Sequence, residues 1–155
     1  MHDSIRVTPA AVVDGEFVEA MQRLIPQLSS SAEIPDHATL AGILASPCTT
    51  LLLARDRTQE NRIVGSLTLA VFRIPTGVRA WIEDVVVDVP ARGQGVGAAL
   101  SREALRIARS LGAGTVELTS RPSREAANRL YRRLGFQRRQ TNVYRYALRD
   151  DEHAG

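Results

Sequence analysis

A glycine-rich turn separates a hydrophobic strand pattern from a helical pattern in the stretch DVPARGQGVGAAL at residues 88–100. Glycine lets backbone N–H groups approach a ligand closely, and the N-terminus of a helix attracts anions. A chain with this pattern passes from strand to helix at this point and leaves room for an anion beside the turn. The stretch therefore predicts a phosphate-binding turn within a domain of mixed strands and helices.

Apolar spacing divides the rest of the chain into further elements. The expected helices cover 15–28, a short stretch between Pro35 and Pro47, 95–111, and a stretch from a Ser123 cap to Gly135. The expected strands cover 5–7, 49–56, 62–74, 79–89 and 115–119, with one or two more in 136–148. Three consecutive strands with short turns indicate an antiparallel meander, and the strand–helix–strand unit after it indicates a crossover to a parallel strand.

The length of 155 residues predicts a single domain over 1–150 with a frayed tail at 151–155. No apolar run approaches the roughly 20 residues of a membrane helix. The N-terminus has no signal-type apolar core, so we expect a cytoplasmic protein with no membrane partner. Cys48 is the only cysteine, which excludes an intrachain disulfide and a multi-cysteine zinc site. The histidines are scattered, and we expect no metal.

All 20 basic residues are arginine. The absence of lysine excludes a Walker-type phosphate loop and Schiff-base catalysis. A net charge of +3 is compatible with nucleic-acid binding, but acids alternate with the arginines along most of the chain and only 5% of residues are aromatic. A solvated arginine-rich surface is therefore favoured, and a nucleic-acid binder that uses the arginines of 129–145 is a weaker alternative.

Two known patterns fit the glycine turn. Gly93, Gly95 and Ala98 satisfy the dinucleotide fingerprint, with Glu117 downstream, but that fold opens with this unit, whereas here it follows an antiparallel array. Arg92, Gly95 and Gly97 fit R/Q-x-x-G-x-G/A, which resembles motif A of the GNAT superfamily of N-acetyltransferases. The stretch REAANRLYRRLGF at 124–136 resembles motif B of the same family. The two motifs together favour the second pattern.

The resemblance implies an α/β (α+β) GNAT fold with a mixed sheet of six or seven strands and about four helices. It implies acetyl-CoA as co-substrate and direct acetyl transfer to a primary amine of a small molecule or peptide. The resemblance assigns the diphosphate to Arg92, Gly93, Gln94, Gly95, Val96, Gly97 and Ala98. It assigns the pantetheine arm to the strand edge at Val85, Val86 and Val87, where the fourth and fifth strands splay apart. An N–H near Val85 or Val86 would face the thioester oxygen.

An alkyl amine is mostly protonated at neutral pH, so transfer requires a base. Glu83 matches the position of a catalytic glutamate in several family members, and Asp84 is the alternative; in a regular strand the two would point to opposite faces. Tyr131 matches the motif B tyrosine that protonates the departing thiolate. Asn128, one turn before Tyr131, is a candidate contact for the pantetheine arm. The chain departs from the family pattern here, since Arg124 stands where the usual family asparagine lies, earlier on this helix. A surface role for Glu83 and a core role for Tyr131 also fit the sequence.

The acceptor amine is left open by the sequence. WIEDVVVD at 81–88 is similar to the glucosamine-phosphate acetyltransferase branch, which suggests an amino sugar phosphate. Protein N-termini, polyamines, amino acids and antibiotics are equally open. A non-catalytic acyl-CoA sensor on the same fold is the alternative function. The family resemblance and an exposed last strand suggest a homodimer.

Overall fold

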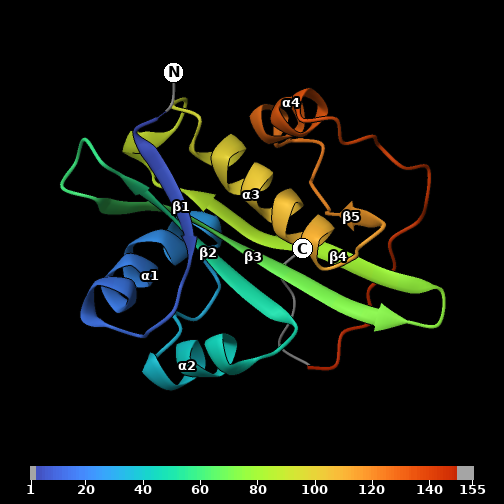
Figure 1. The fold of residues 1–155 in the computed structure, drawn as a ribbon, viewed down its shortest axis with the longest axis horizontal. Coiled ribbons are helices and arrows are strands. Elements are labelled where there is room, and N and C mark those ends of the chain that lie inside the picture. The colour runs from blue at the N-terminus through green and yellow to red at the C-terminus, as the bar shows by residue number, and fades with distance from the viewer. Residues whose placement is uncertain (1–2, 150–155) are drawn as a thin grey trace.

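The computed structural model describes residues 3–149, in which five strands form one sheet in the order β1-β2-β3-β4-β5 (Figure 1). The strands are β1 (Ile5–Pro9), β2 (Thr49–Asp56), β3 (Arg62–Ile74), β4 (Gly77–Val87) and β5 (Thr115–Glu117). Neighbours from β1 to β4 are antiparallel, and β5 is parallel to β4. The predicted meander and the parallel unit are thus confirmed. The expectation of six or seven strands is wrong for the described residues, where the sheet ends at β5.

The helices of residues 3–149 are α1 (Gly15–Leu28), α2 (His37–Ala45), the short 3-10 turn η1 (Val89–Ala91), α3 (Val96–Ser110) and α4 (Glu125–Arg133). Asp14 caps α1 by accepting the N–H of Phe17 at 2.9 Å, and Asp36 caps α2 by accepting that of Thr39 at 2.8 Å. None of these helices is long and apolar enough to cross a bilayer.

The sheet carries a separate hydrophobic core on each face. Along β2, Leu52 and Ala54 pack into the core beneath α3, whereas Leu51 and Leu53 pack into the core beneath α1 and α2. This alternation is that of a strand buried on both sides. The α3 core includes Val96, Leu100, Ala104 and Ala108, and the α1–α2 core includes Phe17, Ala20, Met21, Leu24 and Leu40. Both faces of the sheet are therefore covered by helices.

Two predictions for the C-terminal part are wrong. The N-cap of α4 is Arg124, which makes no side-chain cap bond, so Ser123 does not cap this helix. The stretch 136–148, where we expected one or two strands, contains no strand. A strand needs a hydrogen-bonded neighbour, and this stretch has none within the described residues. The predicted tail at 151–155 lies outside the described residues.

Candidate active site

Strand β4 contains a β-bulge around Asp84. Ser66 of β3 pairs with Val86, and Thr68 pairs with Glu83. One residue of β3 therefore faces two residues of β4, which defines the bulge. Asp84 itself has a φ of 49°, in the left-handed region that residues other than glycine rarely adopt. The bulge thus gives β4 a left-handed backbone conformation at Asp84, directly after Glu83.

The bulge reverses the faces that β4 presents. Ile82 packs into the core beneath α3, whereas Val86, four residues later, packs into the core beneath α1 and α2. In a regular strand both side chains would lie on the same face. We expected the side chains of Glu83 and Asp84 to point to opposite faces of the sheet if the strand were regular. Strand β4 is irregular at these residues, so that condition is not met. Both carboxylates are exposed.

Strands β4 and β5 pair over a short distance and then separate. Their pairing covers only Arg79 to Trp81 of β4 and Thr115 to Glu117 of β5. Among residues 3–149, β4 has from Ile82 to Val87 a strand neighbour on the β3 side and none on the other. Main-chain groups at this edge have no strand partner, and the carbonyl of Val87 accepts a side-chain hydrogen bond from Arg92.

The hydrogen bonds around β4 indicate which main-chain groups face the free edge. The N–H of Asp88 donates to the carbonyl of Val64 in β3 at 2.9 Å. Successive residues of a strand direct their N–H and C=O groups to opposite edges, so Val85 and Val87 direct theirs away from β3. The Nε of Arg92 donates to the carbonyl of Val87 at 3.1 Å, in agreement with that direction.

The glycine turn between η1 and α3 has two residues in the left-handed region. Gly93 has a φ of 77°, and Gly95, the N-cap of α3, has a φ of 83°. The first N–H that α3 uses is that of Ala99, which donates to the carbonyl of Gly95 at 3.0 Å. The amides of residues 96–98 have no partner within the helix, as at any helix N-terminus. The turn therefore presents main-chain donors at the positive end of a 15-residue helix.

The third glycine of the motif serves packing. A Cβ on Gly97 would lie 3.0 Å from the Cδ2 of Leu130 in α4 and 3.9 Å from a methyl carbon of Val87 in β4. Three elements therefore meet at Gly97: the glycine turn, the end of the free β4 edge, and α4. This contact brings the helix of motif B against the start of α3.

Tyr131 follows Leu130 on α4 and is half-buried. Its ring packs edge-on against Phe136, with centroids 5.6 Å apart and an interplanar angle of 67°. Burial raises the pKa of the Tyr131 phenol above its usual value, and the positive charge of Arg124 partly opposes this. The hydroxyl therefore holds its proton at neutral pH, as a proton donor must.

Asn128 has a structural partner. Its Nδ2 donates to the carbonyl of Arg121 at 3.0 Å, which ties α4 to the loop after β5. Its proposed contact with a pantetheine arm remains a prediction.

A polar cluster that the sequence did not reveal joins α1 to the entry of the glycine turn. Asp88 is 6% exposed and accepts Nη1 of Arg23 at 2.5 Å and Nε2 of Gln27 at 2.9 Å. The Oε1 of Gln27 accepts the N–H of Val89 at 2.9 Å, and Nη2 of Arg23 donates to the carbonyl of Ile63 at 3.0 Å. The i, i+4 spacing of Arg23 and Gln27 was the available signal, but it does not identify Asp88 as their partner.

Residues 3–149 contain no group of three or more histidines, cysteines or carboxylates that could hold a metal ion. The candidate site consists of main-chain donors, two exposed carboxylates and a phenol. Such groups can bind an extended anionic ligand and move protons.

The sequence of the chain matches a known protein family. A sequence model described as the acetyltransferase (GNAT) family matches residues 17–136. No curated protein sequence matches the chain.

Solved structures share the fold. An aminoglycoside acetyltransferase from an uncultured soil metagenomic sample, in complex with sisomicin, superposes with a TM-score of 0.81 at 22% identity, over 95% of this chain and 98% of its own. A glucosamine-6-phosphate N-acetyltransferase from Arabidopsis thaliana gives 0.74 at 16% identity, over 93% and 99%. A structure described as a transcriptional regulator from Bacillus halodurans gives 0.76 at 24% identity, over 92% and 100%. With the family match over most of its length, the chain belongs to the GNAT acetyltransferase family.

Proposed function

We propose that this chain is an N-acetyltransferase that moves the acetyl group of acetyl-CoA directly to a primary amine of a small molecule or peptide. The observation that carries the proposal is the convergence at Gly97, where the free edge of β4 meets the glycine turn and α4. An extended ligand with a diphosphate at one end and a thioester at the other matches this arrangement in chemistry, with main-chain donors at the turn and a strand edge beside it.

The glycine turn binds the diphosphate in this proposal. The amides from Gly93 to Ala98 and the dipole of α3 supply the attraction without lysine. The pantetheine arm then lies along Val85 to Val87 and pairs with main-chain groups as an added strand would. The N–H of Val85, which points to the free edge, stabilises the negative charge on the thioester oxygen.

Glu83 is the general base that takes a proton from the attacking amine, directly or through water. It lies at the start of the bulge, is exposed, and can therefore reach an acceptor that enters from solvent. Asp84 is the competing base. Tyr131 donates its phenolic proton to the sulfur as the carbon–sulfur bond breaks, and its raised pKa means that the phenol still carries this proton at neutral pH.

The acceptors named for similar structures suggest where to begin. One neighbour is an aminoglycoside acetyltransferase, and another acts on glucosamine 6-phosphate. We therefore propose amino sugars as the first acceptor class to test, with peptide N-termini, polyamines and amino acids beside them.

The test incubates the protein with acetyl-CoA and this amine panel and follows the release of free thiol. We expect turnover with at least one amine, and a loss of about 100-fold in kcat for Glu83→Gln, as for removal of a general base. Asp84→Asn is the matched control, because it alters the neighbouring carboxylate. If Asp84→Asn has the large effect and Glu83→Gln the small one, the base is Asp84.

Calorimetry with coenzyme A separates the alternatives. No binding of coenzyme A would contradict the proposal as a whole. Tight binding without turnover on any amine would instead indicate the acyl-CoA sensor.

A further inference from the structure

We propose that Trp81 and Glu117 select the acceptor, and that they favour an amine that carries a second ammonium group. This inference rests on the proposed function and names an acceptor class for it. It starts from the place where β4 and β5 separate. Trp81 pairs with Glu117, and these are the last residues that the two parallel strands pair before they part. The two side chains therefore stand beside the free edge of β4 that the thioester would occupy.

Glu83, Trp81 and Glu117 lie on one face of the sheet. The register of β4 with β3 is regular up to Glu83, so side chains alternate between the faces as far as that residue. Ile82 packs into the core beneath α3, so Trp81 and Glu83 on either side of it point to the opposite face. Val116 of β5 also packs against the α3 core, so Glu117 next to it points the same way as Trp81.

Helices α1 and α2 leave this part of the face uncovered. Their core includes Val86 of β4, but within residues 3–149 neither Trp81 nor Phe72 of the same face belongs to that core or packs against it. The β3–β4 hairpin extends to one side of both helices (Figure 1). Glu83 is exposed, and Trp81 and Glu117 are half-buried. An acceptor can therefore lie on this face while the pantetheine arm lies along the β4 edge.

The two carboxylates and the indole favour a cation. Neither Glu83 nor Glu117 forms an ion pair with another residue of the described chain. An ammonium group is attracted by a carboxylate and also by the face of an indole within about 6 Å. In the proposed reaction Glu83 takes the proton of the attacking amine, so Glu117 and Trp81 remain for a second ammonium group on the same molecule.

The geometry of the sheet sets the separation of the two ammonium groups. Adjacent strands lie about 4.8 Å apart and two residues of a strand span about 6.6 Å, which puts the Cα atoms of Glu83 and Glu117 about 8 Å apart. The extended five-carbon diamine cadaverine has a comparable length. Arg79 limits this length, because it lies on the same face two residues before Trp81 and its charge repels an ammonium group placed further along β4.

Steady-state acetylation of diamines and matched monoamines tests the proposal. We expect kcat/KM for cadaverine to exceed that for pentylamine about tenfold, and the ten-carbon α,ω-diamine to lose most of this preference. Glu117→Gln should reduce the preference for cadaverine about fivefold, because it removes the charge and keeps the shape, and should leave kcat/KM for pentylamine unchanged. Trp81→Leu should reduce the preference as well, whereas Trp81→Phe, which keeps an aromatic face, should retain most of it.

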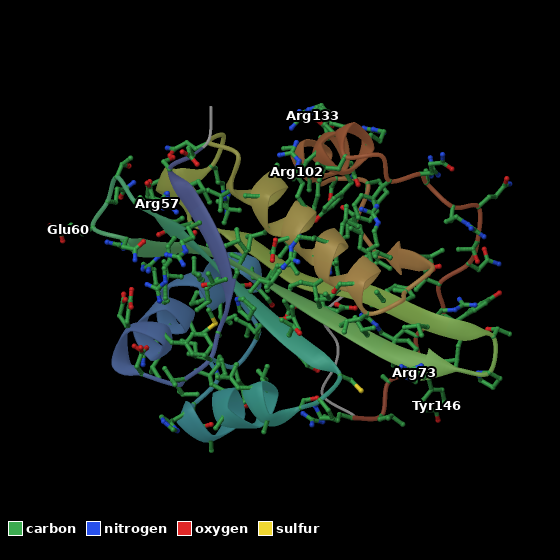
Figure 2. All side chains as sticks on the ribbon, viewed as in Figure 1. Arg57, Glu60, Arg73, Arg102, Arg133 and Tyr146 are labelled. Carbon is green, nitrogen blue, oxygen red and sulfur yellow. The ribbon has the colours of Figure 1, made fainter. Side chains whose placement is uncertain are left out.

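Glu60→Gln is the matched control. Glu60 is an exposed carboxylate in the turn between β2 and β3. Figure 2 shows it at the opposite end of the molecule from Arg73, which lies near the tip of the β3–β4 hairpin. The substitution removes the same charge from the protein and should leave the preference for cadaverine unchanged.

Calorimetric binding of cadaverine and pentylamine to the protein distinguishes this inference from the proposed activity. Tighter binding of cadaverine that is lost in Glu117→Gln would support the site even without acetylation of any amine, and only the proposed activity would then fail. Equal affinities and equal kcat/KM values for the two amines would overturn the inference and leave the activity standing. A preference for cadaverine that survives in Glu117→Gln would overturn it equally.

Discussion

At the residue scale, the glycines of the turn separate into two kinds. Gly93 and Gly95 have positive φ values, so their conformation excludes most side chains, whereas Gly97 is small because Leu130 packs against it. The glycine pattern of this turn therefore combines a backbone requirement with a packing requirement. Sequence spacing alone predicted the turn but did not distinguish the two requirements.

Gly93→Ala tests the backbone requirement by itself. A Cβ at this position meets nothing within 4 Å, so the substitution adds no clash, but its φ of 77° costs an alanine roughly 1–2 kcal/mol. If the strain displaces the turn amides, the KM for acetyl-CoA should rise about tenfold, since about 1.4 kcal/mol corresponds to a factor of ten. Gly42→Ala in α2, which also has open space and has no positive φ, should leave that KM unchanged. Equal KM values for the two variants would mean that the turn does not bind the coenzyme.

Tyr131→Phe removes the phenolic hydroxyl and keeps the ring that packs on Phe136. We expect kcat to fall about 100-fold, with little change in melting temperature or in coenzyme affinity, because only proton donation is lost. Burial raises the pKa of this phenol above the ordinary tyrosine value of about 10. At any pH below about 10, ionisation of Tyr131 should therefore not reduce kcat. Steady-state kinetics across pH and thermal unfolding together check this. A variant with wild-type kcat would leave Tyr131 as a core residue only.

At the element scale, the cluster of Arg23, Gln27 and Asp88 connects α1 to the start of the glycine turn. Asp88 is nearly buried and its carboxylate has two charged or polar partners, so the end of β4 is fixed against α1. Helix α1 is thus linked to the entry of the glycine turn through one carboxylate.

Gln27→Ala should loosen this connection. Asp88 loses one hydrogen bond and the N–H of Val89 loses its acceptor, so the free energy of unfolding should fall by about 1–3 kcal/mol. The KM for acetyl-CoA should rise severalfold as the turn loses support, with kcat less affected. Urea unfolding and steady-state kinetics measure the two effects. Glu19→Gln is the control, since Glu19 is 62% exposed and its contact with Arg23 is 3.4 Å long; it should change neither quantity appreciably. An unchanged stability for Gln27→Ala would show that the cluster is not a structural link.

The elements also show where sequence reasoning succeeds. The helix over 15–28 and the strands over 49–56 and 62–74 were predicted with their observed bounds, because their apolar periodicity is long and uninterrupted. The bulge at Asp84 could not be predicted, since an aspartate in the left-handed region is held there by its neighbours in the sheet. The bulge nevertheless lies directly beside the proposed base, Glu83.

At the scale of the whole molecule, the missing strands have a physical explanation. The expectation of one or two strands in 136–148 is wrong for the described residues, because the composition of a stretch does not specify an edge with which it can pair. The same limit applies to Asp88, whose partners lie more than 60 residues earlier in the chain. Local patterns therefore predicted the elements and the glycine turn, while the free β4 edge and the polar cluster depend on long-range pairing.

The packing of α3 against the sheet requires a close approach at Gly65. A substitution at this residue therefore tests whether the sheet, α3 and the glycine turn depend on one another. A Cβ on this residue of β3 would lie 2.9 Å from Cγ1 of Val96, 3.1 Å from the carbonyl of Val86 and 3.2 Å from Cδ1 of Leu100. Val96 begins α3, so any shift that admits the methyl group moves this helix and the glycine turn before it together.

Gly65→Ala should therefore lower the free energy of unfolding by about 1–3 kcal/mol, as overpacking of a core does. For a chain of this length the melting temperature should fall by roughly 2–4 °C for each kcal/mol. Gly114→Ala is the matched control, because its Cβ would meet nothing within 4 Å and its φ is not positive. Differential scanning calorimetry of both variants gives the comparison, and coenzyme affinity should fall only in Gly65→Ala. A Gly65→Ala protein with wild-type melting temperature would mean that α3 can move away from the sheet without loss of stability. Close packing at Gly65 would then not be required for the stability of the fold.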